Sequence, residues 1–412
     1  MVSLARTADG RAVRPSLTLA LLSVQHALIH GQSALYPLVY LVIIDEFGVT
    51  SGTIALLAAV ASIISGSLQL VFGAVTRFVS RRTLLGVGGL IVGLGTTLQA
   101  AAGSFLPFAA ANVLSRLGSA PQHPVGNALI AEQYPIHRWG FAISAHIAGG
   151  NVGTVAVGFV AAAAIALLGW RASIVLLGLP AIVVGTAILL LVRESGADRA
   201  TAAAAGGVLS AYRRVVGDRD LRWLFLSAML GGGARGLGVL NVFVPLYLDR
   251  TVGLDLATIG AMYAVLLAAS VPGPLVAGWL SDRFGRKPLI VLVYLAGAAS
   301  LAGFVLAGET LPLLWIAVVA LSLFSFVESP QLQALLADIT DAEIRDAAYS
   351  TYFALAFGVG SLWVLAYGAL VSGLGDDLGL PLVFWLMAAA SVAAAFAVLP
   401  IRVEDRRAQV RG

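Results

Sequence analysis

The chain is a succession of apolar runs, each about 20 residues long, separated by short stretches that hold charged residues, proline or glycine. A run of this length, folded as an α-helix, spans the ~30 Å hydrocarbon core of a bilayer. The composition agrees, because 59% of the 412 residues are hydrophobic and 11% are charged, whereas soluble domains have about 45–50% and about 25%. We therefore predict an all-α membrane protein and exclude a set of soluble domains.

Twelve transmembrane helices are predicted from these runs. Strands of a membrane β-barrel would alternate apolar and polar residues, and residues 84–105 show no such alternation. The predicted spans lie near 16–44, 53–75, 83–104, 105–131, 139–167 and 170–192, and then near 221–248, 256–280, 288–307, 311–337, 347–372 and 380–400.

The cationic side chains are distributed unequally between the two sides of the membrane. If both termini are cytoplasmic, 21 of the 25 Lys and Arg residues fall in the tails and the even-numbered connections. Only Arg171 and Arg250 fall on the opposite side, while Arg116 and Arg235 fall inside spans. Cytoplasmic loops carry an excess of Lys and Arg, so both termini are predicted to be cytoplasmic. Lys287 is the only lysine, and all the other cationic residues among the 25 are arginines. This preference for arginine favours a bacterial source, and hence a location of the protein in the cytoplasmic (inner) membrane.

The two halves of the chain resemble one another. Arg81–Arg82 correspond to Arg286–Lys287 at a shift of 205 residues, and PVGNALIAE (124–132) corresponds to PQLQALLAD (330–338) at a shift of 206. Apolar helices match by chance, but two matches anchored by polar residues favour a duplication. Duplicated helical halves are typical of transporters, with the site between them near the midplane. We predict an N-terminal six-helix half (1–192), a cytoplasmic linker (193–220) and a C-terminal six-helix half with a short tail (221–412).

The segment GWLSDRFGRK (278–287) resembles the loop signature of the major facilitator superfamily. The resemblance covers the whole chain and implies two pseudo-symmetric six-helix bundles that rock about a central site. In the first half the signature is degraded to GAVTRFVSRR, with Arg77 in place of the aspartate and Ser80 in place of the glycine, which leaves the locking role of that loop open. The resemblance implies a role in conformational gating for Asp282, Arg283, Gly285 and Arg286.

A narrower resemblance is to the fosmidomycin-resistance group of exporters. It rests on His26, on the pair His123–Pro124 and on GGNVG (149–153). The chain departs from that group at His30–Gly31, where the group has Asn-Asp. The Gly-Pro pair that drug antiporters carry in span five is also missing. The resemblance implies export of the substrate.

Seven ionisable residues lie inside the predicted spans, and such groups usually face a bundle interior or an aqueous cavity. Six of them lie on spans one, four, seven and ten, which line the central cavity in the fold that the chain resembles, and each is within about 7 Å of the midplane. His26 and His30 are spaced i,i+4 and share a helix face, as do Arg116 and His123 at i,i+7. The seven are His26, His30, Arg116, His123, His146, Arg235 and Glu328.

The two intramembrane arginines come from opposite halves and can together hold an anion. A guanidinium binds carboxylate, phosphate or phosphonate through its forked donors. The alternative is that each arginine satisfies backbone carbonyls or pairs with Glu328, and this single carboxylate can neutralise only one of them. The predicted substrate contacts are Arg116, Arg235, His30, Tyr36 and His123.

Proton coupling needs a group that titrates as its surroundings change. Glu328 can take a proton when substrate occupies the arginines and release it when they are free. Histidine titrates near neutrality, so His26, His30 and His123 are competing candidates. A lone intramembrane histidine is more often a packing residue, and we interpret His146 in that way and His137 as a loop residue.

Several classes of site are not predicted. Two histidines at i,i+4 can share Zn²⁺, but cysteine is absent and no carboxylate has the spacing to complete a site, so no metal is expected. Phosphate-loop, dinucleotide and nucleophile-elbow motifs are missing as well, so we expect no cofactor and no enzyme activity. The expected partners are a small-molecule substrate, protons and the lipid bilayer, with no nucleic acid, and the chain is expected to be a monomer.

These patterns predict a proton-coupled secondary transporter that exports a small anionic or zwitterionic organic molecule by alternating access. Uptake of such an anion by symport is an alternative, because the same residues serve either direction. A broader drug/proton antiporter is a second alternative, although a cationic-drug exporter would want acidic residues in the first half of the cavity. A non-transporting membrane receptor is the third.

Overall fold

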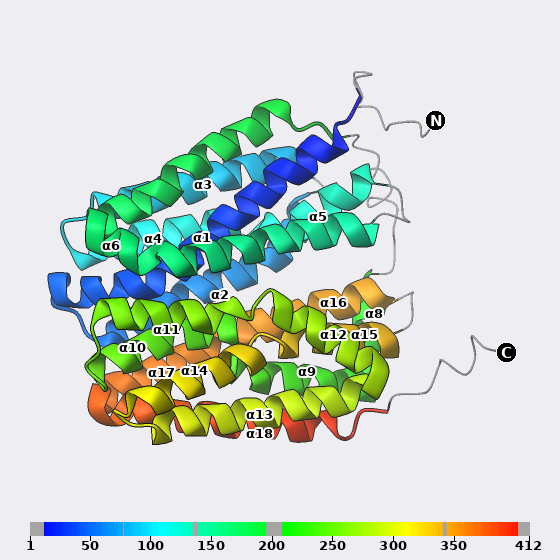
Figure 1. The fold of residues 1–412 in the computed structure, drawn as a ribbon. Helices are drawn as coiled ribbons and strands as arrows, with labels where there is room; N and C mark the ends of the chain where they lie inside the picture. Colours follow the sequence, from blue (N-terminus) through cyan, green and yellow to red (C-terminus); the bar gives the residue numbers. More distant parts are fainter. Residues whose placement is uncertain (1–11, 77, 135–138, 195–207, 341–343, 403–412) are drawn as a thin grey trace.

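The computed structural model describes residues 12–76, 78–134, 139–194, 208–340 and 344–402. Its regular elements in these ranges are helices that run roughly along one direction (Figure 1). Ten helical stretches are long and apolar enough to cross a membrane. Arg77, His137 and the 201–207 segment lie outside the described residues. The all-α membrane fold predicted from the apolar runs is confirmed.

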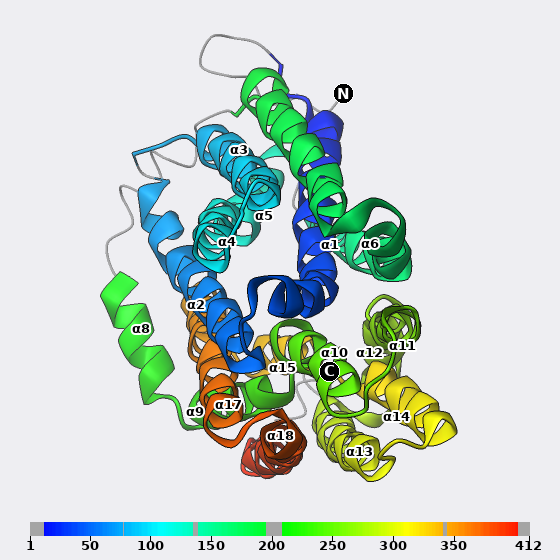
Figure 2. The same cartoon turned by 90° about the vertical axis from the view of Figure 1, so that its left-hand side faces the viewer.

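The first half contains six crossings. Helix α6 holds two of them, because the backbone folds back at Gly169 (φ 79°, ψ 158°), and α4 and α5 together make another. The elements are α1 (Pro15–Phe47), α2 (Ser51–Val75), α3 (Arg81–Ala100), α4 (Phe105–Ser119), α5 (Gln122–Gln133) and α6 (Trp139–Leu191). These helices occupy the upper part of Figures 1 and 2, and α2 lies at the boundary with the second half.

The second half follows a short helix, α8 (Val208–Gly217), whose Val215 is fully buried against that half. Its elements, which also make six crossings, are α9 (Arg219–Gly231), η2 (Gly232–Ala234), η3 (Gly236–Leu240), α10 (Asn241–Arg250), α11 (Leu256–Ala268), α12 (Pro272–Phe284), α13 (Arg286–Leu306), α14 (Leu311–Phe324), α15 (Glu328–Ile339), α16 (Arg345–Phe353), η5 (Ala354–Val359), α17 (Ser361–Leu374) and α18 (Asp376–Val398).

Several spans that the sequence predicts as continuous are interrupted near their centres. Span four breaks at Ala120–Pro121, between α4 and α5, and span ten breaks at 325–327, between α14 and α15. Span seven changes from α-helix to 3₁₀ and π-helix around Arg235. Helices α5 and α15 begin 206 residues apart, at Gln122 and Glu328, so the breaks follow the internal repeat. Interrupted helices expose backbone polar groups, and membrane proteins tolerate them where they line a cavity.

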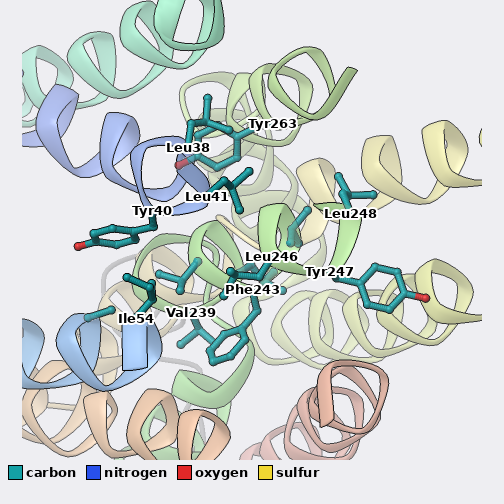
Figure 3. Packing of buried hydrophobic residues seen from close by; sticks show 14 of the residues in the cluster. Leu38, Tyr40, Leu41, Ile54, Val239, Phe243, Leu246, Tyr247, Leu248 and Tyr263 are labelled. Carbon is teal, nitrogen blue, oxygen red and sulfur yellow. The ribbon is translucent and has the colours of Figure 1, made fainter. Parts of the chain in front are cut away.

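The two halves are packed together at the end of the molecule where α1 ends and α2 begins, which is the predicted periplasmic side. A continuous apolar cluster joins them there, with Leu38 and Leu41 of α1 facing Leu246 of α10 and Tyr263 of α11 (Figure 3). At its rim, a guanidinium nitrogen of Arg250 donates to Asp45 at 2.6 Å. The hydroxyl of Ser51 donates to Asp376 at 3.0 Å. These contacts hold the halves closed on that side.

Candidate functional site

A cavity of about 160 Å³ lies between the halves. Arg116 of α4 reaches it from the first half, and Arg235, between η2 and η3, reaches it from the second. The structure therefore brings the two predicted arginines to one space. The remaining polar lining was not predicted and comes from Ser62, Ser65 and Gln69 of α2 and from Ser361 of α17.

Arg235 is held by groups of the protein itself. Its Nε donates to Oε1 of Glu328 at 2.9 Å, and one terminal nitrogen donates to the carbonyl of Ala356 at 2.6 Å. The other terminal nitrogen is 3.4 Å from the carbonyl of Ala228. The guanidinium also lies over the ring of Phe357, 4.5 Å from its centroid. Both alternatives considered from the sequence, a carboxylate partner and backbone carbonyls, hold for this arginine.

Arg116 has a different environment. One terminal nitrogen donates to the hydroxyl of Ser33 at 2.8 Å, and the guanidinium lies 5.3 Å from the centroid of the Tyr36 ring. Among the residues that the structure describes, no carboxylate lies within 4.0 Å of this guanidinium. The side chain is half-buried and lines the cavity. Arg116 is therefore a cation in low-dielectric surroundings whose charge is balanced by no described side chain.

Tyr36, which was predicted as a substrate contact, is 1% exposed. Its hydroxyl accepts a hydrogen bond from Nε2 of Gln99 at 2.8 Å. Nearby, the hydroxyl of Thr96 donates to Oε1 of Gln32 at 3.0 Å. These bonds fix the Tyr36 ring against Arg116, so the structure places Tyr36 as a support for that guanidinium. Sequence reasoning missed this network, because uncharged polar residues inside spans carry no distinctive spacing.

The predicted histidines gather in the first half. The rings of His26 and His30 on α1 have centroids 4.4 Å apart, and that of His123 is 4.8 Å from His26. His146 of α6 joins them, because its ring stacks on His26 at 4.5 Å. His146 is fully buried and both its ring nitrogens lack a hydrogen-bond partner among the described residues. It therefore belongs to the cluster, whereas the sequence alone favoured the interpretation of an ordinary packing residue.

His123 lies on α5 and Arg116 on α4, so the break at Pro121 separates two residues that were expected to share one helix face. His123 is exposed within the structure, whereas His26 is buried and His30 is half-buried. The proton-exchange role expected for His26, His30 and His123 stays a prediction.

Glycines of α6 make the histidine cluster possible. A Cβ atom on Gly150 would lie 2.8–3.0 Å from three ring atoms of His26. A Cβ on Gly153 would lie 2.0 Å from the carbonyl oxygen of Ala27. The GGNVG segment thus brings the backbones of α1 and α6 into close contact, as small residues do between membrane helices.

The signature loops make equivalent contacts in both halves. Nε of Arg286 donates to Asp338 at 3.0 Å, and a terminal nitrogen of Arg81 donates to Glu132 at 2.6 Å. These pairs correspond under the repeat seen in the sequence. Gly285 has φ 96° and joins α12 to α13, a conformation that favours glycine. Arg283 is exposed against the ring of Phe284, and the Asp282 side chain lies outside the described part of the structure.

Two helical halves around a charged central cavity define a secondary membrane transporter. The chain belongs to the Major Facilitator Superfamily, whose sequence pattern matches residues 22–364 and, in a second match, residues 235–411. Its relatives are transporters, so the chain is not an enzyme. The comparisons establish the superfamily and not the narrower fosmidomycin-resistance group.

Individual relatives are distant. A probable L-galactonate transporter of Escherichia coli (strain K12) is 25% identical over 263 residues, which are 60% of this chain and 58% of that relative. The chain thus spans less than two thirds of that relative's length.

Two solved structures share the fold. A bacterial homologue of the human lysosomal transporter Spinster, inward-facing and unoccupied, has a TM-score of 0.73 at 17% identity, covering 94% of this chain and 95% of the other. A D-xylose-proton symporter has a TM-score of 0.70 at 18% identity, covering 93% and 97%.

Proposed function

We propose that this transporter carries a small organic anion, and that the anion's acidic group binds Arg116. The observation that carries the proposal is the contrast between the two cavity arginines. Glu328 balances the charge of Arg235 at 2.9 Å, whereas Arg116 contacts the hydroxyl of Ser33 and the ring of Tyr36 and has no carboxylate partner among the described residues. An isolated charge in the membrane interior is costly, and a bound anion would remove that cost. Arg235 faces the same cavity and becomes a second contact when Glu328 releases it.

The cavity favours a small hydrophilic molecule over a drug. Its volume of about 160 Å³ is below the ~300–1,000 Å³ typical of sites for drug-sized ligands. The hydroxyls of Ser62, Ser65 and Ser361 and the amide of Gln69 line it, and they suit a substrate that carries several hydroxyl groups. A carboxylate with attached hydroxyls, of the size of a sugar acid, meets all these requirements. The relative named as a probable L-galactonate transporter supports this substrate class.

Coupling to protons is assigned to Glu328 in this proposal. Oε1 of Glu328 accepts from Arg235, while Oε2 is buried and has no hydrogen-bond partner among the described residues. A proton bound at Oε2 would neutralise the carboxylate and weaken its hold on Arg235, which then turns to the substrate anion. Among the described residues, the phenols of Tyr294 and Tyr352 are titratable groups that lie close to this pair. Similarity to a D-xylose-proton symporter supports coupling of this kind.

The direction of transport follows from the gradients in this scheme, because the same residues load and release substrate on either side. Export, which the resemblance to the fosmidomycin-resistance group implies, and uptake by symport differ in whether proton and anion move oppositely or together. A cationic-drug exporter is disfavoured, because the described residues that line the cavity include no carboxylate, and Glu328 is buried and paired with Arg235.

Flux measurements on proteoliposomes test the proposal. Radiolabelled galactonate, neutral galactose and a lipophilic cation are compared, each with an inward proton gradient, an outward gradient and no gradient. We expect flux of galactonate that depends on the gradient, and the sign of that dependence gives the direction. Gradient-driven flux of the cation with none of galactonate would contradict the proposal. Binding of galactonate without any flux would favour the receptor alternative.

A further inference from the structure

Three histidines of the first half present their ring nitrogens to one another. One nitrogen from each of His26, His30 and His123 lies within 4.8 Å of the others, and Nε2 of His26 is 3.0 Å from Nε2 of His30. In a neutral imidazole one ring nitrogen carries a proton and the other a lone pair. The tautomer of each ring therefore decides what this cluster can bind.

The tautomer of His26 is fixed by its partner on α6. Nδ1 of His26 lies 3.0 Å from the backbone carbonyl oxygen of His146. A carbonyl oxygen accepts hydrogen bonds and cannot donate them, so Nδ1 of His26 carries the proton. The lone pair of the neutral ring is then on Nε2, the atom that faces His30.

A hydrogen-bond chain allows His30 the same arrangement. The hydroxyl of Thr154 donates to the carbonyl of Gly150 at 3.3 Å, and its oxygen can then accept from Nδ1 of His30 at 3.2 Å, which places the lone pair of His30 on Nε2. In the other tautomer, Nε2 of His30 donates a hydrogen bond to Nε2 of His26 at 3.0 Å. A metal ion bound by both Nε2 atoms would take the place of that shared proton. Histidines that ligate metals usually donate their other ring N–H to a carbonyl, carboxylate or water, and His26 matches that pattern.

We propose that His26, His30 and His123 bind one divalent transition-metal ion of the Zn²⁺ type. Zn–N distances of ~2.0–2.1 Å place the nitrogens of a tetrahedral site about 3.3 Å apart. The two α1 histidines are already at 3.0 Å. His123 is exposed within the structure, so its ring can rotate to close the remaining distance. Three imidazoles leave a fourth position for water or a substrate oxygen, as in catalytic zinc sites.

The chemistry of the cluster selects the ion. Imidazole suits Zn²⁺, Co²⁺, Ni²⁺ and Cu²⁺, whereas Mg²⁺ and Ca²⁺ require oxygen ligands, and the three ligands include no carboxylate. The positive charge of Arg116 lies within electrostatic range of His30, so the ion is expected to bind more tightly when an anion occupies the cavity. The sequence alone pointed away from a metal, because cysteine is absent and no carboxylate has the spacing to complete a site with the i,i+4 pair. The helix break at Pro121, which starts α5 beside α1, supplies the third ligand.

The test uses the purified full-length protein with ZnCl₂ or CoCl₂ as the only added ligand. Calorimetric titration is expected to show one saturable Zn²⁺ site per chain, and Co²⁺ to give visible d–d absorption that Zn²⁺ abolishes. His123→Ala and His30→Gln are each expected to weaken Zn²⁺ binding about tenfold or more. His137→Gln, which replaces a histidine that the sequence predicts to lie in a loop, is the matched control and should bind as the native chain does.

Two outcomes would overturn the proposal. One is the absence of saturable Zn²⁺ binding by the native chain. The other is Zn²⁺ binding that neither His123→Ala nor His30→Gln weakens. Unchanged thermal unfolding of His123→Ala without metal shows that its loss of binding is not loss of fold, and exposure of this side chain predicts that result. The readout is binding, so it is independent of whether galactonate or any other anion is transported.

Discussion

Nε of Arg235 donates a 2.9 Å hydrogen bond to Oε1 of Glu328, and the two residues are only 7% and 5% exposed. The contact joins the break in span seven to the first residue of α15. Because this carboxylate is paired with Arg235, the charge of Arg116 is balanced by no described carboxylate. In the proposed mechanism Arg116 binds the substrate anion, and the coupled proton binds the carboxylate of Glu328.

Removing the charge of Glu328 should lower the stability of the protein and abolish its coupling to protons. Glu328→Gln leaves Arg235 buried without a counter-ion, and breaking one side of a buried pair costs about 3–5 kcal/mol. We expect a lower apparent melting temperature, loss of gradient-driven transport, and retention of substrate exchange across a membrane with no gradient.

The control for this variant is Arg235→Gln combined with Glu328→Gln. Replacing both charges removes the unpaired cation, so the double variant should recover part of the lost stability. Gradient-driven transport that persists in Glu328→Gln would show that the proton binds elsewhere.

The end of the molecule at which the two halves are packed together, predicted to be periplasmic, should have to open during transport. Ser51 of α2 and Asp376 of α18 come from opposite halves, and their side chains are 3.0 Å apart. The native chain has no cysteine, so Ser51→Cys with Asp376→Cys can be joined by a short bifunctional thiol reagent. We expect transport to fall after joining and to return on reduction, while each single cysteine variant is unaffected. Full transport by the joined protein would rule out opening at this position.

Close contact between α1 and α6 predicts a glycine requirement. Gly153→Ala should destabilise the protein by about 1–3 kcal/mol, because its Cβ would lie 2.0 Å from the carbonyl oxygen of Ala27. Gly303→Ala is the matched control, since nothing lies within 4 Å of that Cβ, and a helical alanine should stabilise slightly. Thermal unfolding in detergent compares the two. Equal unfolding temperatures would mean that the helices separate at little cost.

The repeated loop contacts predict unequal effects in the two halves. The Glu132 side chain is 4% exposed, while that of Asp338 is 45% exposed. Glu132→Gln should therefore cost about 1.5–3 kcal/mol, the range for charged hydrogen bonds, and Asp338→Asn less than about 1 kcal/mol. Unfolding measurements on both variants check this order. A larger loss in Asp338→Asn would show that the intact signature carries more stability than the degraded one.

Much of the fold could be predicted because a membrane constrains helices strongly. Apolar runs gave the spans, and the match of Arg81 and Glu132 to Arg286 and Asp338 gave the repeat. The ion pairs of Arg81 with Glu132 and of Arg286 with Asp338 were not predicted from that match and are seen only in the structure. Ionisable groups inside the spans also indicated a central cavity, because such groups are costly in contact with lipid. The structure agrees for Arg116 and Arg235, which line the same cavity.

The breaks in the helices could not be predicted from apolar periodicity. Pro121 follows a run of small residues that also suits a continuous helix, and only packing against other helices decides that α5 begins anew at Gln122. After the break, the ring centroid of His123 lies 4.8 Å from that of His26. Pairing of Glu328 with Arg235 rather than Arg116 is likewise a tertiary choice, because spacing along separate helices contains no information on which side chains meet.

The central claim is that Arg116 binds the substrate anion, and ligand-induced thermal stabilisation tests it most directly. A ligand that binds only the folded state raises its apparent stability. Galactonate should stabilise the native protein, and galactose and a lipophilic cation should not. In Arg116→Gln the loss of about 2 kcal/mol from a charge-assisted contact should raise the galactonate concentration needed for the same stabilisation about thirtyfold, with Arg116→Lys intermediate. Equal stabilisation of Arg116→Gln and the native protein by an anion would contradict the claim.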